Sequence, residues 1–121
     1  MIQLYQYKAE VITVVDGDTV DLKVDLGFRT FIVDRFRLYG PDPAGKMGLN
    51  APELKTEEGK KAKEALQRII NGLTETYVKT VKDKKCKYGR PLAVLVGTSE
   101  EGEVNVNQKL LDGGWAALKE Y

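Results

Sequence analysis

The chain has 121 residues, 42% of them hydrophobic, and its 19 basic and 18 acidic residues give a net charge of +1. This length suits a single domain over residues 1–121, and the near-zero charge neither requires nor excludes nucleic acid, so any phosphate affinity must come from a local arrangement. The absence of histidine and the lone Cys86 exclude imidazole catalysis, a disulfide framework and a cysteine-based zinc site.

Alternating apolar and polar residues in the first third of the chain predict β-strands. The first strand covers residues 5–15 and is followed by a tight turn at Asp16-Gly17, and the second covers residues 20–26. Gly27 breaks the pattern, which resumes over residues 30–38 as a third antiparallel strand. One face of the first strand is expected to carry Tyr5, Tyr7, Ala9, Val11, Thr13 and Val15.

Asp34 and Arg35 interrupt the alternation of the third strand. The interruption is compatible with a bulge, with a solvent-facing edge, or with two short strands instead of one, and the sequence does not distinguish these. The segment from Pro41 to Gly48 contains two prolines and two glycines, which forbid a regular element. We therefore expect a turn or a loop there.

Beyond Pro52 the apolar period changes to that of a helix. Thr56 can cap its first turn, Glu57 and Glu58 suit the positive end of the helix dipole, and Gly72 can end it. The apolar face, at steps of three and four residues, consists of Ala62, Ala65, Leu66, Ile69, Ile70 and Leu73.

Two further strands are predicted in the second half of the chain. They cover residues 76–82 and 91–96, and they flank a basic turn formed by residues 87–90. The acidic residues in 100–103 predict a polar turn after the second of these strands.

A short helix is predicted near the end of the chain, followed by residues 115–118, which we expect to close the core. Asn105 with Gln108 resembles a capping box at its start, and Gly113-Gly114 ends it. The order is then three strands, a helix, two strands and a short helix. This order predicts a mainly β fold, a five-stranded OB-fold barrel with a helix between its third and fourth strands and a short C-terminal helix.

Asp16 and Asp18 flank a glycine in the first turn. We expect Gly17 to adopt a positive φ, which would let both carboxylates project beyond the sheet edge. An ordinary Asp-Gly hairpin turn is the commoner explanation of this pattern on its own. Arg37, on the third strand, is compatible equally with a surface arginine and with a functional one.

Asn50-Ala51-Pro52-Glu53 suggests a set of oxygen ligands. Proline fixes an extended backbone, exposes the carbonyl of Ala51 and directs Asn50 and Glu53 to nearby points. Carboxylate, amide oxygen, carbonyl and water are the ligands that Ca²⁺ takes, and Mg²⁺ takes more stringently. The alternative is a turn that leads into the helix, with Glu53 solvated.

Lys87-Tyr88-Gly89-Arg90 offers a guanidinium group beside an aromatic ring on a tight turn. This combination suits a phosphate and a stacked base. Because basic turns are common, a solvated loop is the alternative.

Taken together, these segments resemble the staphylococcal nuclease (thermonuclease) family over roughly residues 11–118. The motifs that carry the resemblance are Val15 to Thr19, Arg37 to Gly40 continued by Leu49 to Glu53, Lys87 to Ala93, and the ending from Val106 to Ala116. The resemblance implies an OB-fold barrel and Ca²⁺-dependent hydrolysis of phosphodiester bonds in DNA and RNA, with 3′-phosphate products.

The resemblance also implies roles for single residues. Asp18, Asn50 and the carbonyl of Ala51 would bind the metal, which we expect to be Ca²⁺ in preference to Mg²⁺ or Mn²⁺. Glu53 would be the general base on the attacking water. The groups that contact the nucleic acid would be Arg37 and Arg90 at the phosphate, and Lys87, Tyr88 and Leu92 around the nucleotide.

The metal site departs from the family pattern in one respect. Asn50 stands where the best-known members have a second carboxylate, so the cage loses a negative charge and should bind cations more weakly. Asp42 lies at the family's usual distance from Arg37 and is the alternative source of that charge. Asn50 is preferred because Ala51-Pro52-Glu53 follows it in the family's frame, but the assignment stays open.

The sequence therefore predicts a metal-dependent endonuclease that acts on DNA or RNA, preferably single-stranded. The alternatives are a non-catalytic nucleic-acid-binding module on the same fold and a protein-interaction module. No charged-then-apolar leader and no apolar run of about 20 residues is visible, so we expect a cytoplasmic protein without membrane contact, or a secreted one if a leader has been removed. We expect a monomer, although no sequence feature determines the oligomeric state.

Overall fold

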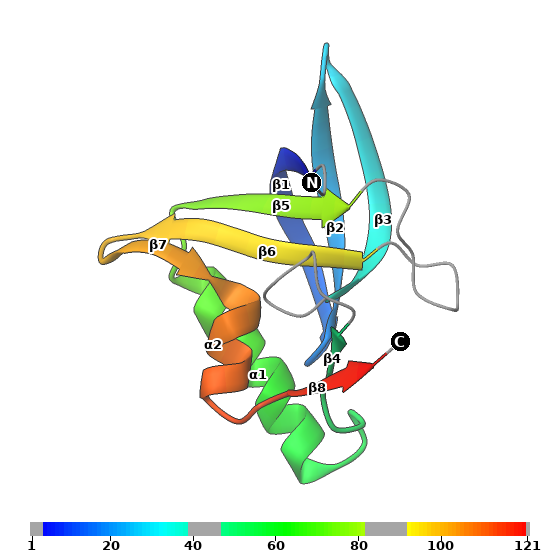
Figure 1. Cartoon of the computed structure of the whole chain (residues 1–121), viewed down its shortest axis with the longest axis vertical. Helices are drawn as coiled ribbons and strands as arrows, with labels where there is room; N and C mark the ends of the chain where they lie inside the picture. Colours follow the sequence, from blue (N-terminus) through cyan, green and yellow to red (C-terminus); the bar gives the residue numbers. More distant parts are fainter. Residues whose placement is uncertain (1–3, 39–46, 82–91, 121) are drawn as a thin grey trace.

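The computed structural model describes residues 4–38, 47–81 and 92–120 (Figure 1). Within these ranges the chain is mainly β. Its elements, in order, are β1 (Leu4–Asp16), β2 (Thr19–Gly27), β3 (Thr30–Leu38), β4 (Met47–Asn50), α1 (Glu57–Asn71), β5 (Glu75–Val81), β6 (Leu92–Ser99), β7 (Gly102–Asn105), α2 (Val106–Asp112) and β8 (Ala117–Glu120).

Five of the described strands close into a barrel. Antiparallel pairing joins β3 to β2, β2 to β1, β1 to β5 and β5 to β6. A parallel pairing of β3 with β6, at Arg37–Leu92 and Leu38–Ala93, then joins the two ends of this row of strands. Because α1 separates the third and fourth barrel strands in the chain, the predicted OB-fold-like architecture is confirmed.

One hydrophobic core connects the barrel with both helices. Its leucines are almost completely buried and come from strands and helices alike, namely Leu22, Leu38, Leu49, Leu66, Leu95 and Leu110. Burial of each such side chain contributes about 1.5–3 kcal/mol. Figure 1 shows both helices at one end of the molecule, while the hairpin of β2 and β3 extends away from them at the other end.

The predicted capping residues of both helices are confirmed. The side chain of Thr56 accepts a hydrogen bond from the N–H of Gly59 at 3.0 Å, and Gly72 caps the end of α1. Asn105 caps α2 by accepting from the N–H of Gln108 at 3.0 Å. None of the helices in the described ranges is long and apolar enough to cross a membrane.

The predicted face of the first strand is wrong beyond Val11. The register between β1 and β2 shifts between Val11 and Thr13, and this irregularity places Ile12 in solvent. Val14 is buried, whereas Thr13 is exposed and Val15 is only half-buried. An extra residue reverses the side-chain alternation after it, because the strand period is two.

The interruption in the third strand marks a solvent-facing edge. β3 is continuous, and its register with β2 is unbroken from Asp25↔Phe31 to Thr19↔Arg37. Its side chains are exposed from Thr30 to Arg35 and become buried only at Phe36 and Leu38. Among the described strands, only β6 pairs with the outer edge of β3, and only at the last two positions.

Three short strands were not predicted. Residues 47 and 48, expected in a loop, belong to β4, which pairs with β8. Within 115–118, expected to close the core, Ala116 is buried but Leu118 is exposed and belongs to β8. The polar turn expected over 100–103 is shorter, because Gly102 and Glu103 pair with β6 as part of β7. β4 and β8 depend on pairing between distant segments, and β7 is only four residues long, so local periodicity does not identify these strands.

Candidate functional site

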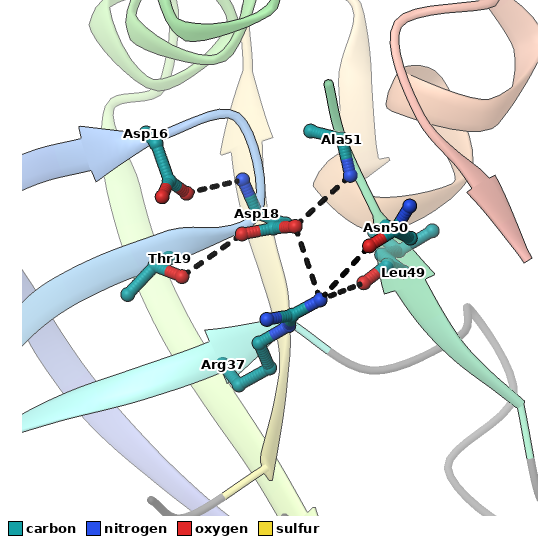
Figure 2. A network of polar contacts seen from close by, with 7 residues as sticks. All are labelled: Asp16, Asp18, Thr19, Arg37, Leu49, Asn50 and Ala51. Atoms are coloured by element: carbon teal, nitrogen blue, oxygen red, sulfur yellow. Dashed lines mark hydrogen bonds and ion pairs between the residues drawn. The ribbon is translucent and has the colours of Figure 1, made fainter. Parts of the chain in front are cut away.

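Three segments that are far apart in the sequence meet at one end of the barrel. They are the turn between β1 and β2, the last residues of β3, and the end of β4. Figure 2 shows the side chains of Asp18, Arg37 and Asn50 turned toward one another, with the backbone of Leu49 and Ala51 beside them. Four of the predicted site residues, Asp18, Arg37, Asn50 and Ala51, are therefore neighbours.

Asp18 is the buried centre of this cluster, with 5% of its surface exposed. Its Oδ1 atom accepts a hydrogen bond from the hydroxyl of Thr19 at 2.9 Å. Its Oδ2 atom accepts one from the backbone N–H of Ala51 at 2.9 Å and lies 3.2 Å from Nη2 of Arg37. One carboxylate thus connects the first turn to both β3 and β4 (Figure 2).

The first turn is held in place by the side chain of Asp16 and by β3. The N–H of Asp18 donates to Oδ1 of Asp16 at 3.0 Å, and the carbonyl of Asp18 accepts from the N–H of Leu38 at 2.8 Å. These bonds fix the direction in which the Asp18 carboxylate leaves the turn.

The expected positive φ at Gly17 is not observed, because the glycines with positive φ in the described ranges are Gly27, Gly102 and Gly114. A different constraint requires glycine at this position. A Cβ atom added to Gly17 would lie 2.7 Å from the Cβ atoms of both Ala51 and Ala62. The close approach of β4 and α1 therefore explains the Asp-Gly-Asp turn.

Arg37 places one nitrogen among three oxygens. Its Nη2 atom lies 3.2 Å from the carbonyl of Leu49 and 3.3 Å from Oδ1 of Asn50, in addition to its contact with Asp18. One carboxylate, one carbonyl and one amide oxygen thus surround a single guanidinium nitrogen. This is the environment of a bound cation, and in this structure the cation is an arginine side chain.

The two acids of the turn have opposite pKa shifts. Burial raises the pKa of Asp18 to about 6, and the neighbouring Asp16 adds to the rise, while the N–H of Ala51 and the charge of Arg37 oppose it. Burial acts in the same sense on Asp16, but hydrogen bonds with Asp18 and Thr19 and the charge of Arg37 hold its pKa below the ordinary value.

The donor set around Arg37 has the chemistry that Ca²⁺ requires. Carboxylate, amide and carbonyl oxygens are hard ligands, and Ca²⁺ takes six to eight of them, including water. The described part of the chain holds no group of three or more acidic, histidine or cysteine side chains that could bind a metal ion. Because Arg37 already contacts oxygens of Asp18 and Asn50, a cation bound there would compete with Arg37 for the same oxygens.

Ala51 and Glu53 differ in how they relate to the cluster. The contact of Ala51 with Asp18 is made by its N–H, whereas the sequence predicted a role for its carbonyl. The carboxylate of Glu53 is 73% exposed and lies 3.2 Å from Nζ of Lys55. The carbonyl of Glu53 accepts hydrogen bonds from the N–H and hydroxyl of Thr56, so its backbone is attached to the start of α1.

The remaining predicted site residues are only partly described. Asp42, Lys87, Tyr88 and Arg90 lie outside the described residues. For Leu92 the backbone is described and pairs with Arg37.

Sequence reasoning missed two members of the cluster, the hydroxyl of Thr19 and the carbonyl of Leu49. A threonine directly after Asp18 is a signal that a sequence can offer. A backbone carbonyl leaves no signal in the sequence, because every residue has one.

A separate hollow of about 630 Å³ lies between α1 and α2, and its lining includes Arg68, Lys109 and Trp115. It contains none of the predicted site residues. The convergence of charged groups at Asp18, not the size of a hollow, therefore identifies the candidate site.

Comparison of the sequence with protein-family models finds no match, and comparison with curated proteins finds none either.

Proposed function

We propose that this protein is a metal-dependent nuclease of the staphylococcal nuclease type, which hydrolyses phosphodiester bonds in single-stranded DNA or RNA. The observation that carries the proposal is the meeting of Asp18, Arg37 and Asn50 at one end of an OB-fold-like barrel. These residues come from two of the motifs that carry the resemblance to that family, Val15 to Thr19 and Arg37 to Gly40 continued by Leu49 to Glu53. Their side chains supply a carboxylate, a guanidinium group and an amide, which suit a cation and a phosphate.

Arg37 would bind the scissile phosphate in exchange for its present partners. A guanidinium group presents paired N–H donors that match two phosphate oxygens, and this bidentate contact stabilises charge that develops on them. The exchange keeps the guanidinium group paired with an anion, while Asp18 gives up its ion-pair partner. Arg90, outside the described residues, would supply the second guanidinium group, and Lys87, Tyr88 and Leu92 would contact the nucleotide.

Glu53 would accept the proton of the attacking water. Without histidine in the chain, a carboxylate is the natural general base near neutral pH. The backbone of Glu53 is held by Thr56, while its exposed side chain pairs with Lys55. Because an exposed ion pair contributes only about 0–1 kcal/mol, rotation of the Glu53 side chain toward a substrate would cost little.

The cation is expected to be Ca²⁺, with Mg²⁺ and Mn²⁺ less favoured. Asp18, Asn50 and the carbonyl of Ala51 would hold it, with Asp42 as the alternative source of a second carboxylate. When bound, it would supply neutralisation of the charge on the phosphate.

A cleavage assay tests this proposal. Single-stranded DNA and RNA labelled at one end are incubated with the protein and Ca²⁺, and then with an excess of chelator. We expect fragments that require Ca²⁺ and are absent with Asp18→Asn. The exposed Asp34 provides the matched control, since Asp34→Asn changes an acid outside the cluster and should keep full activity.

Two observations favour a non-catalytic nucleic-acid-binding module as the second candidate. Arg37 is already paired with Asp18, and the carboxylate of Glu53 lies against Lys55. The same assay separates the candidates. DNA that is retained but not cleaved would select the binding module, and neither binding nor cleavage would select a protein-interaction module.

A further inference from the structure

The hairpin of β2 and β3 carries large apolar side chains in solvent. It extends beyond the rest of the barrel, at the end opposite the helices (Figure 1). Val33 is 65% exposed, and the exposed apolar side chains of the hairpin are Leu26, Phe28, Phe31, Ile32 and Val33. A concentration of this kind within eight residues of one hairpin marks an interaction surface.

Within the described ranges, the outer edge of β3 has no partner strand from Thr30 to Arg35. Among the described strands, β6 pairs with that edge only at Arg37 and Leu38, so the stretch from Thr30 to Arg35 pairs with β2 alone. Such an edge presents a row of backbone donors and acceptors to another strand. Proline and lysine commonly protect such an edge from pairing, and the stretch from Thr30 to Arg35 contains neither.

The exposed side chains lie on both faces of β3. Phe31 and Val33 share the face of Lys23, whose Nζ atom lies 4.6 Å from the centre of the Phe31 ring. Ile32 lies on the other face, opposite Val24. A flat partner such as a membrane or a stack of bases could cover one face only. A strand added at the edge contacts side chains on both.

We propose that two copies of this protein associate through antiparallel pairing of their β3 strands about a two-fold axis at Ile32. In this register Ile32 faces Ile32 of the second copy, and Phe31 faces Val33 of the second copy. Aromatic and β-branched side chains form favourable cross-strand pairs. A shift by two residues would set Ile32 against Thr30 or Asp34, so only this register places all three apolar residues against apolar residues.

The charged residues beside the apolar stretch are compatible with this register. Asp34 would face Thr30 of the second copy, whose hydroxyl can donate to a carboxylate. Arg35 carries its own counter-ion, because its Nε atom lies 2.9 Å from Oδ1 of Asp21. Beyond the paired stretch, Arg35 would face Arg29 of the second copy, and the ion pair of Arg35 with Asp21 offsets part of this like charge.

The proposed dimer is independent of the proposed nuclease activity. Its paired residues end at Asp34, and Arg37 lies further along β3, beside β6. This inference replaces the monomer expected from the sequence, and it is tested by mass and cross-linking, not by cleavage.

Sedimentation equilibrium from low micromolar to near-millimolar concentration tests the association. We expect a reversible dimer whose dissociation constant rises roughly tenfold or more in Val33→Lys, because two Phe31–Val33 pairs are lost. Ile12→Lys, which changes an exposed apolar residue on β1, should leave it unchanged. Since Val33 is exposed, Val33→Lys should keep the circular dichroism spectrum of the wild type. A monomer at every concentration, or a dimer unaffected by Val33→Lys, would overturn the proposal.

Cross-linking tests the register. In a Cys86→Ser background, Ile32→Cys should form a disulfide-linked dimer on mild oxidation. Facing residues of antiparallel strands have Cα atoms about 4.5–5.5 Å apart, within the roughly 4.4–6.8 Å that a disulfide spans. Ile12→Cys in the same background is the control and should form no disulfide-linked dimer. Absence of the Ile32→Cys dimer, or equally fast linkage of Ile12→Cys, would contradict the pairing.

Discussion

The Nη2 atom of Arg37 lies 3.2 Å from the Oδ2 atom of Asp18, and the same oxygen accepts a hydrogen bond from the N–H of Ala51 at 2.9 Å. This oxygen therefore connects the first turn to β3 and to the end of β4. Because Asp18 is buried, removal of Arg37 would leave its carboxylate without a charged partner in a poorly solvated place. The structure and the proposed chemistry thus depend on the same contact.

The titration of Asp18 is the first prediction. Its pKa of about 6 lies above the ordinary 3.8, so the protonated form contributes stability that is complete below about pH 3.8 and is lost as the pH rises through 6. A shift of this size corresponds to at most about 3 kcal/mol. Carbon-13 NMR of the aspartate carboxyl groups should show one residue with a midpoint near pH 6.

Arg37→Met tests whether the charge of Arg37 affects the pKa of Asp18. The charge of Arg37 lowers the pKa of Asp18, so its removal should move the midpoint upward. Arg35→Met, which removes the partner of the more exposed Asp21, is the matched control and should leave the midpoint unchanged. An Asp18 midpoint near pH 4 would contradict burial as the cause of the raised pKa, and no response to Arg37→Met would contradict the opposing effect of the arginine charge.

The second prediction concerns Asn107, a fully buried polar side chain on α2. Its amide donates to the carbonyl of Ala93 at 3.1 Å and accepts from the N–H of Leu95 at 3.0 Å. Asn107→Leu would leave both backbone groups without these bonds. Each buried group left without its bond costs about 1–3 kcal/mol. Urea denaturation should therefore show a loss of roughly 2–6 kcal/mol, the sum over the two groups. Asn71→Leu, at an exposed site, should change stability by less than about 0.5 kcal/mol.

Gly17→Ala is the third prediction. The added methyl group would lie 2.7 Å from the Cβ atoms of Ala51 and Ala62, so the turn and α1 must move apart. Overpacking of this kind typically costs about 1–3 kcal/mol in the free energy of unfolding. Gly72→Ala is the control, because its nearest neighbour would be 3.5 Å away and its φ is −80°. Equal stability of the two variants would show that the contact at Gly17 is easily relieved.

The fourth prediction concerns the general base. Glu53→Gln should lower the turnover number by roughly 10²–10⁴-fold, the usual contribution of a general base, while affinity for single-stranded DNA changes little. Glu57→Gln alters a nearby acid on the first turn of α1 and should retain activity. Turnover in Glu53→Gln equal to that of Glu57→Gln would remove Glu53 from the mechanism.

The tip of the β2–β3 hairpin supplies the fifth prediction. Phe28 and Arg29 have φ values of +54° and +63°, a left-handed conformation that costs about 1–2 kcal/mol per residue with a side chain. Replacing the pair by Asn-Gly, which suits such a turn, should raise the free energy of unfolding by about 1 kcal/mol or more. An Ala-Ala pair keeps the steric penalty and should give no gain. Thermal and urea unfolding of the three proteins will distinguish these outcomes.

Local signals in the sequence were enough to place the long elements. Alternation identified β2 and β3, and a threonine cap, an apolar stripe and a terminal glycine identified α1. These signals lie within a few residues of one another, so they can be recognised in the sequence without knowledge of the fold. The order of the elements then predicted the OB-fold-like barrel.

The same reasoning could not place features that depend on distant segments. The pairing of β4 with β8 joins residues near 48 to residues near 118, and neither segment has a pattern that indicates pairing with the other. The irregularity near Ile12 depends on the register with β2. A positive φ was predicted as the reason for glycine at position 17, but the contact that requires glycine comes from Ala51 and Ala62.

By itself, the sequence determined which groups are present: an acid beside a tight turn, an arginine on a strand, an amide and an acid before a helix, and no histidine. Only the tertiary structure decided that Asp18, Arg37 and Asn50 share one site, and that the exposed carboxylate of Glu53 pairs with Lys55. The physical reason is that residue type fixes charge and hydrogen-bonding capacity, whereas distance and burial are set by barrel closure and by the pairing of remote strands.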